Sequence, residues 1–300
     1  MINGIINVYK EKGYTSHDVV AKLRGILKQK KIGHTGTLDP DAEGVLPVCL
    51  GNATKLCDIL TDRSKTYQAV LLLGTTTDTQ DITGTVLSQR PVMAGEEEIR
   101  KAVLSFQGSY AQIPPMYSAL KIGGKRLYEL AREGIEVPRE ARKVEIHSIE
   151  IEELDILTGQ VTITVGCSKG TYIRTLCHDI GEQLGCGGCM KSLLRTRAGE
   201  FHISKSLKIN EIADKINEGN LDEYIKKADE MFAGYPGINV KQEFDKQLYN
   251  GNFLSADQII QEDIDISAER IRVYDWQGNF VGLYEGRPDE RIMKPYKMFL

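Results

Sequence analysis

The stretch "KTYQAVLLLGTTT", residues 65–77, is typical of a strand at the centre of a sheet, with apolar residues on both of its faces. Strands are also expected at residues 4–10, 142–154 and 159–168, and a turn near Gly159 predicts that the last two form an antiparallel pair. These runs predict a mixed, mainly antiparallel sheet at the core of an α+β fold.

Apolar residues at helical spacing predict the helices that flank this sheet. A helix at residues 15–27 has Thr15 or Ser16 as its N-cap, and another at residues 171–185 ends at Gly185. Acidic residues occupy the first turn of a third helix, as the helix dipole favours. This third helix is expected at residues 96–106, and three more are expected at residues 53–62, 209–219 and 221–232.

The composition shifts between Gly234 and Gly237, and short strands and turns follow. In this part "DWQGNF", residues 275–280, is a hairpin signal in which Gly278 supplies the turn. We therefore expect a larger domain at residues 1–235 and a small β-barrel domain at residues 236–300.

The bulk composition is that of an ordinary globular protein, with 41% hydrophobic and 27% charged residues in a chain of 300. The net charge of -4 argues against a generic nucleic-acid binder but is compatible with a local basic groove. The sequence has no apolar run long enough for a membrane helix, and its N-terminal apolar patch is too short for a signal peptide. We expect a cytoplasmic protein that does not associate with membranes.

Six cysteines are expected to be reduced thiols in such a chain. "CGGC", from Cys186 to Cys189, has the spacing of a metal or redox pair, but a structural zinc site needs four ligands and no second pair matches. A tight glycine turn between two thiols is the favoured interpretation. The metal or redox alternative predicts bound zinc or a disulfide.

Residues 31–55, "KIGHTGTLDPDAEGVLPVCLGNATK", form a constrained loop around Asp39. Pro40 suits the first position of a helical turn, which would make Asp39 an N-cap. Gly33 and Gly36 instead suggest a loop that holds its shape while it presents His34 and other polar side chains, as functional loops do. The loop lacks the motifs of a phosphate-binding loop, and no second histidine lies nearby in the sequence to complete a metal site.

Two later residues have a structural and a functional interpretation each. Arg174 is either a surface residue paired with Asp179 or Glu182, or a cation held opposite an anion such as Asp39. Tyr67 is either a core tyrosine or a face on which a base stacks.

Two basic stretches, residues 121–134 and 190–208, suggest phosphate contacts on an otherwise acidic protein.

The order of these stretches resembles the bacterial tRNA pseudouridine-55 synthases, the TruB family. The resemblance covers residues 2 to 210, with a weaker match in the tail. It is carried by "GHTGTLDPDAEGVLPVCLGNATK", "KTYQAVLLLGTTTDTQDITG", "QIPPMYSALKIGGKRLYELAREG", "CSKGTYIRTLCHDIG" and "LLRTRAGEF". The chain departs from the family pattern at Glu11, where a proline usually follows the lysine, and at Gly188 and Cys189, after "GCG".

The resemblance implies roles for individual residues. Asp39 matches the catalytic aspartate, Tyr67 the active-site tyrosine that packs on the target base, and Arg174 the arginine that pairs with the aspartate. The substrate-binding set that we expect is His34, Tyr172, Leu193, Lys10 and Gly36. The tail resembles a PUA domain, a small RNA-binding barrel.

The resemblance also implies the reaction, which is conversion of uridine to pseudouridine at position 55 in the T loop of tRNA. We expect tRNA, through its T stem-loop, as the partner, and a monomer without an obligate protein partner, cofactor or metal. The alternative is a non-catalytic module that binds or folds tRNA. Such a module has no need to keep Asp39, Tyr67 and Arg174 together.

Overall fold

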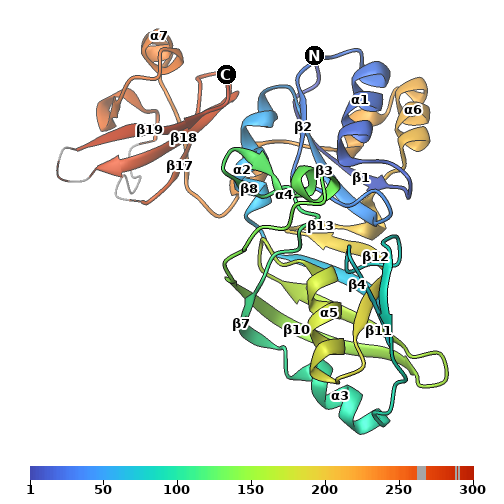
Figure 1. Cartoon of the computed structure of the whole chain (residues 1–300). Helices are drawn as coiled ribbons and strands as arrows, with labels where there is room; N and C mark the ends of the chain where they lie inside the picture. Colours follow the sequence, from blue (N-terminus) through green and yellow to red (C-terminus); the bar gives the residue numbers. More distant parts are fainter. Residues whose placement is uncertain (262–267, 288, 290) are drawn as a thin grey trace.

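The computed structural model describes residues 1–261, 268–287, 289 and 291–300, so the predicted C-terminal domain includes positions outside the described residues. Figure 1 shows a large part that contains the N-terminus and, beside it, a smaller sheet built from the C-terminal residues.

The large part is built on one ten-stranded sheet among the described residues, whose main path runs β14-β1-β3-β12-β4-β11-β10-β7. β13 adds to β12 and β2 adds to β3. The strands are β1 (Gly4–Lys10), β2 (Ile32–His34), β3 (Glu43–Leu50), β4 (Lys65–Leu73), β7 (Gly108–Gln112), β10 (Arg142–Asp155), β11 (Gln160–Cys167), β12 (Gly188–Ala198), β13 (Phe201–His202) and β14 (Ile225–Lys226).

The predicted central strand is confirmed, because β4 pairs antiparallel with β11 on one side and β12 on the other. The predicted pair β10–β11 is also antiparallel. Among the described strands of this sheet, the β12–β3 pair alone is parallel. The expected mixed, mainly antiparallel sheet is therefore confirmed.

Two short hairpins lie outside the main sheet. One joins β5 (Thr75–Thr77) to β6 (Val86–Gln89), and the other joins β8 (Lys121–Ile122) to β9 (Lys125–Arg126).

Helices cover the sheet much as the apolar spacing predicts (Figure 1). The side chain of Thr15 caps the first helix by accepting a hydrogen bond from the backbone of Asp18. The helices are α1 (Ser16–Leu27), α2 (Cys57–Thr61), α3 (Glu96–Leu104), α4 (Leu127–Arg132), α5 (Ile173–Gln183), α6 (Ile209–Glu218) and α7 (Asp245–Tyr249), and the short 3-10 segments are η1 (Gly51–Leu56), η2 (Ile203–Lys205), η3 (Leu221–Tyr224), η4 (Asp229–Phe232), η5 (Gln242–Phe244) and η6 (Ala256–Gln258).

The helix predicted at residues 221–232 is wrong. This segment forms two short 3-10 turns, η3 and η4, with the edge strand β14 between them. β14 pairs with β1, where Ile5 lies opposite Lys226. Sheet hydrogen bonds to β1 therefore replace the helix that local spacing favoured, because tertiary context overrides propensity.

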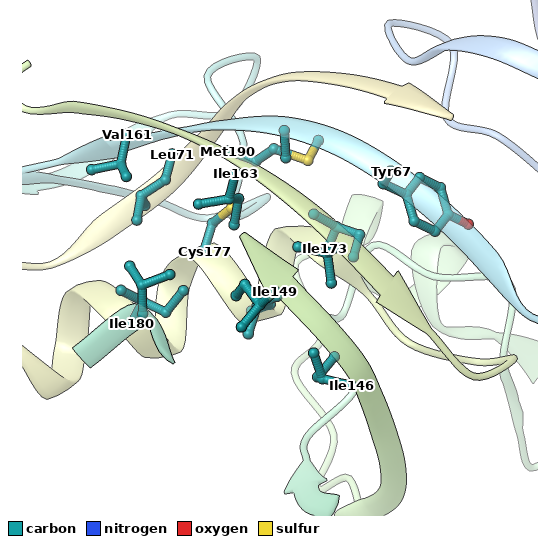
Figure 2. Close-up of a cluster of buried hydrophobic side chains, with 14 of the residues drawn as sticks. Tyr67, Leu71, Ile146, Ile149, Val161, Ile163, Ile173, Cys177, Ile180 and Met190 are labelled. Atoms are coloured by element: carbon teal, nitrogen blue, oxygen red, sulfur yellow. The ribbon is translucent and has the colours of Figure 1, made fainter. Parts of the chain in front are cut away.

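A large apolar cluster joins the sheet to α5 and reaches the loop that carries Asp39. Figure 2 shows its side chains, among them Leu71 of β4, Ile163 of β11 and Ile180 of α5. Tyr67 lies at one end of this cluster, with its hydroxyl pointing away from the labelled side chains. The core therefore ends where the candidate site begins.

The C-terminal part is a five-stranded sheet, in the order β15-β17-β18-β19-β16, that curls into a half-barrel. Gly278, with φ +84°, forms the predicted turn between β17 and β18. Its strands are β15 (Gly237–Asn239), β16 (Leu254–Ser255), β17 (Ile271–Tyr274), β18 (Phe280–Arg287) and β19 (Ile292–Met298).

The C-terminal sheet has an apolar core of its own and also packs against the large part. The contact is aromatic, because the ring of Phe232 lies 6.4 Å from that of Phe280 and 6.1 Å from that of Phe299, centroid to centroid.

Candidate active site

Asp39 lies in a turn between β2 and β3. The backbone amide of Ala42 donates to the carbonyl of Asp39 at 3.1 Å, and no helix follows Pro40. The N-cap interpretation of Asp39 is therefore wrong. Its carboxylate instead faces Arg174, with Nε 3.0 Å from Oδ2 and Nη2 3.4 Å from Oδ1. Two guanidinium nitrogens thus engage two carboxylate oxygens, the geometry that fixes a carboxylate most strictly.

Arg174 is the second residue of α5 and is only 5% exposed. Its Nη2 donates to the carbonyl of Tyr117 at 2.8 Å and its Nη1 to the carbonyl of Thr79 at 3.1 Å. The carboxylate of Asp81 lies 3.8 Å from Nη1. The guanidinium is therefore held from several sides before any substrate arrives.

The alternative in which Arg174 is a surface residue paired with Asp179 or Glu182 is wrong. Glu182 pairs with Arg90 at 2.8 Å, away from the site. Arg174 lies too deep to reach the outer face of α5, because its own neighbours are the loops that contain Thr79 and Tyr117.

Exposure differs sharply across the Asp39–Arg174 pair. The Arg174 side chain is 6% exposed, whereas that of Asp39 is 43% exposed. The arginine is thus part of the scaffold, and the carboxylate is the group that a ligand can reach. This is the arrangement required for a reactive carboxylate that a fixed cation aims.

Tyr67 is a core tyrosine, as the first of its two interpretations predicted. It is 8% exposed and contributes to the core cluster, yet it lies opposite Arg195 across the β4–β12 pairing. Burial raises the pKa of Tyr67, and the nearby charge of Arg195 opposes that rise. The phenol is therefore a neutral group at neutral pH, at the edge where the apolar core meets the site.

Arg195 belongs to the basic stretch at residues 190–208, for which phosphate contacts were expected, but its side chain is enclosed by the protein. It is 1% exposed, and its Nε donates to the carbonyl of Val45 at 2.7 Å while Nη2 donates to that of Gly36 at 3.3 Å. Its guanidinium lies beneath the loop that contains Asp39 and supports this loop from behind.

Lys10 has the same role on the other side of the loop. It has no exposed area, and its Nζ donates to the carbonyls of Ala42 at 2.6 Å and Pro40 at 3.0 Å. Burial lowers the pKa of this lysine to about 8, although the charges of Glu43 and Asp39 oppose the shift. The predicted direct contact of Lys10 with substrate is not supported, because the side chain is enclosed by the turn that it holds.

His34 and Gly36 lie in the loop itself. The His34 ring contacts that of His17 edge to face, with 5.2 Å between centroids. Burial lowers the pKa of His34, and the charges of His17 and Arg195 add to the effect. Gly36 has φ +80°, a conformation that favours glycine, and its carbonyl accepts from Arg195.

Tyr172 and Leu193 border the same region. Tyr172 precedes α5, and its backbone is clamped by the side-chain amide of Gln112, which accepts from Tyr172 N at 2.8 Å and donates to Tyr172 O at 3.0 Å. Burial raises the pKa of the Tyr172 phenol. Leu193 is half-buried, packs on the core cluster, and lies opposite Ala69 of β4.

Three residues in this constellation were not predicted as site residues. Asp81 faces Arg174, Gln112 fixes Tyr172, and the carbonyl of Tyr117 holds Arg174. The run "DTQDITG" was interpreted only as a turn, although its two aspartates and two threonines within seven residues were a signal of a built polar cluster. The roles of Gln112 and the Tyr117 carbonyl depend on contacts far apart in the chain, which no local pattern shows.

The six cysteines form no disulfide among the described residues. All six cysteines are free, and Cys186 and Cys189 are buried on either side of Gly187, whose φ is +79°. The predicted tight turn between the two thiols does not form, because Gly188 and Cys189 already belong to β12 and the turn lies before them, at residues 184–185. In the described part of the chain, no three His, Cys, Asp or Glu side chains are grouped so that they could hold a metal ion.

Two family models match the chain. The model described as "TruB family pseudouridylate synthase (N terminal domain)" matches residues 24–173, and "tRNA pseudouridylate synthase B C-terminal domain" matches residues 174–233. The chain belongs to the TruB family of pseudouridylate synthases. The junction between the two models falls inside α5, so the TruB sheet draws on both segments, and β12 from the second pairs with β4 from the first.

Relatives match over the full length of the chain. A protein of Lachnoclostridium phytofermentans named tRNA pseudouridine synthase B is 53% identical, with 100% of both chains covered. A protein of the same name from Alkaliphilus oremlandii is 46% identical, with 99% of this chain and 97% of the relative covered.

Solved structures share the fold. A Cbf5-Nop10-Gar1 complex contains a chain with a TM-score of 0.72 and 27% identity, and an H/ACA RNP bound to a substrate RNA containing 2'-deoxyuridine contains one with a TM-score of 0.70 and 25% identity. In both comparisons 99% of this chain and 85% of the other are covered.

No helix among the described residues combines the length and apolar character needed to cross a membrane.

Proposed function

We propose that this chain converts uridine to pseudouridine in tRNA, with Asp39 as the catalytic residue. One observation carries the proposal: an exposed carboxylate is aimed by a buried arginine, 3.0 Å away, in a member of the TruB family. Relatives that match the full length are named tRNA pseudouridine synthase B, which supports tRNA as the substrate.

The reaction breaks the N1–C1′ bond, turns the uracil and joins C5 to C1′, and C5 loses a proton that N1 gains overall. No electrons are gained or lost, so one carboxylate that attacks or stabilises the sugar or the base is sufficient. Attack of Asp39 at C1′, attack at C6 and a glycal route all use this carboxylate. Arg174 would hold it toward the reacting atom in each case.

The target uridine must leave the stack before Asp39 can reach it, at a cost of a few kcal/mol. Tyr67 offers an aromatic face in exchange, and stacking on such a face contributes about 1–3 kcal/mol per base. His34, Tyr172, Leu193 and Gly36 would line the space that receives the flipped nucleotide. Lys10 would act through the loop that it supports, as a positioning residue.

We further propose that the modified uridine is at position 55 in the T loop, and that residues 1–235 are the catalytic domain. Residues 236–300 would then form a PUA-like RNA-binding domain. The separate apolar core of the C-terminal sheet supports this division. We expect a monomer that needs no protein partner for activity, and sedimentation of the active protein tests this.

The decisive test is Asp39→Asn, assayed by tritium release from tRNA that contains 5-tritiated uridine. We expect turnover to be abolished while tRNA is still bound. Asp41→Asn is the matched control, because that carboxylate is 52% exposed and lies 3.9 Å from Lys12, away from Arg174. Substantial turnover by the Asp39→Asn protein would contradict the assignment.

The alternative, a non-catalytic module that binds or folds tRNA, makes a different prediction. In that case the wild-type protein would bind unmodified tRNA and form no pseudouridine. Mapping the pseudouridines formed in such tRNA both decides between the two functions and identifies the position.

A further inference from the structure

A cavity of about 550 Å³ lies directly behind the catalytic loop, and the reaction proposed above does not use it. Thr35, between His34 and Gly36, forms part of its wall. Other walls come from the end of α2, from the turn between β12 and β13, and from Met231 of η4. Met231 precedes Phe232, whose ring contacts the C-terminal sheet. The cavity therefore lies between the loop that contains Asp39 and the C-terminal part.

The chemistry of the lining is divided between an apolar floor and a basic rim. Leu60, Phe201 and Met231 are buried apolar residues of the floor. Arg63 and Arg197 stand exposed at the rim. The one acidic residue in the described lining, Glu200, is already paired with Lys226. The rim therefore has two positive charges that no carboxylate of the described lining balances.

A β-bulge directs Arg197 to this cavity. Across the β12–β4 pairing, Arg195 lies opposite Tyr67 and Arg197 lies opposite Thr66, with a register shift between the two arginines. Tyr67 and Thr66 are neighbours in a strand, so their side chains point to opposite faces. Residues opposite each other in a sheet share a face, so the two arginines point to opposite faces as well. Without the bulge, residues two apart would both point to the catalytic face.

Local contacts hold the guanidinium of Arg197 and the stem of Arg63. The Nε of Arg197 donates to the carbonyl of Gly199 at 2.8 Å, which leaves its two terminal nitrogens available. Gly199 has φ +58°, and a Cβ there would lie 3.2 Å from the Cβ of Arg63, so this turn packs on the Arg63 stem. Within the described residues, the Arg63 guanidinium has no hydrogen bond or ion pair.

We propose that this basic cavity, defined by Arg63 and Arg197 at its rim, binds a phosphate group. Two guanidinium forks line this one cavity without an acid partner in the described lining, and they supply the donors that a phosphate group accepts. The phosphate belongs either to the backbone of the RNA or to a free anion such as inorganic phosphate. The RNA source rests on the proposed function, and there the contact would hold the RNA chain in register with Asp39.

The test measures binding of unmodified tRNA at several salt concentrations for the wild-type protein, Arg63→Ala and Arg197→Ala. Arg100→Ala is the matched control, because Arg100 is an exposed arginine of α3 that pairs with Glu96. If the phosphate is part of the RNA, each cavity variant binds tRNA more weakly. The negative slope of log K against log[salt] then becomes shallower by about 0.7–0.9. The double variant then loses less than the sum of the single losses, because both arginines grip one phosphate.

Calorimetric titration with inorganic phosphate tests whether the cavity binds a free anion. Phosphate binding that is lost in Arg63→Ala, with tRNA affinity unchanged, assigns the cavity to a free anion. If neither tRNA affinity nor phosphate binding differs from the wild type, the proposal is overturned. This result is distinct from failure of the proposed function, in which the wild-type protein itself forms no pseudouridine.

Discussion

Replacement of Arg174 by lysine tests whether the site depends on the guanidinium fork or only on a positive charge. Arg174 donates to both oxygens of Asp39 and to the carbonyls of Tyr117 and Thr79. A lysine ammonium keeps the charge, but its three donors radiate from one atom and cannot span these four acceptors. We expect the variant to keep its fold and to lose much of its turnover.

The magnitude follows from the contacts that are lost. A hydrogen bond to a charged group contributes about 1.5–3 kcal/mol. If Arg174→Lys loses one of the two bonds to Asp39 in the transition state, turnover falls about 10- to 150-fold, since 1.36 kcal/mol corresponds to tenfold. A carbonyl left without a donor, that of Thr79 or Tyr117, lowers the free energy of unfolding by about 1–3 kcal/mol.

Single-turnover tritium release measures the chemical step, and urea denaturation measures the stability. Arg90→Lys is a suitable control, because Arg90 is 40% exposed in its pair with Glu182 and lies outside the site. A turnover rate within twofold of the wild type for Arg174→Lys would refute the reasoning. A loss of stability without loss of turnover in the folded fraction would show that Arg174 is only structural.

Three further predictions concern the support of the loop. Burial lowers the folded-state pKa of Lys10 to about 8, so between about pH 8 and 10.5 the unfolded chain binds more protons than the folded one. The free energy of unfolding of the wild type should therefore rise relative to that of Lys10→Met as the pH increases through this range. Urea denaturation at several pH values measures this difference, and a difference that falls with pH would contradict the prediction. Gly44→Ala should lower the free energy of unfolding more than Gly36→Ala does. A Cβ at Gly44 would lie 2.2 Å from the carbonyl oxygen of Arg195, whereas one at Gly36 meets only side-chain atoms at 3.8 Å or beyond. Equal losses of unfolding free energy, measured by urea denaturation, would show that the strand has room to shift. Asp81→Asn should reduce turnover less than Asp39→Asn, because Asp81 is 14% exposed and lies 3.8 Å from Arg174. Tritium release by both variants measures this order. The opposite order would make Asp81 the reactive carboxylate.

Local patterns predicted much of the fold because the elements have strong periodic signals. The strand at Lys65–Leu73 and the helix at Ile173–Gln183 both formed within a few residues of their predicted bounds. The helix predicted at residues 221–232 was wrong because the edge strand of two residues found there depends on its partner β1. Partner strands far apart in sequence leave no local signal.

The candidate site divides in the same way. The pairing of Asp39 with Arg174, at 3.0 Å across 135 positions of sequence, was one of two open interpretations, and the structure decides between them. Periodicity alone could not show that Arg195 is buried, because whether a basic residue of a strand faces solvent or the site depends on the bulge next to it.

The cations beneath the loop that contains Asp39 bear on how a protein with net charge -4 can attract RNA. Lys10 and Arg195 are fully buried or nearly so, and Lys65 is 7% exposed, yet the hydrogen bonds described for them go to backbone carbonyls. A buried charge is costly unless it is hydrogen-bonded, and carbonyl acceptors satisfy the donors without neutralising the charge. The positive charge therefore survives inside a region of low dielectric, where its field is screened less than that of a surface lysine. Placed beneath the one loop where substrate is expected to bind, three such cations give an acidic protein a local field that favours a polyanion.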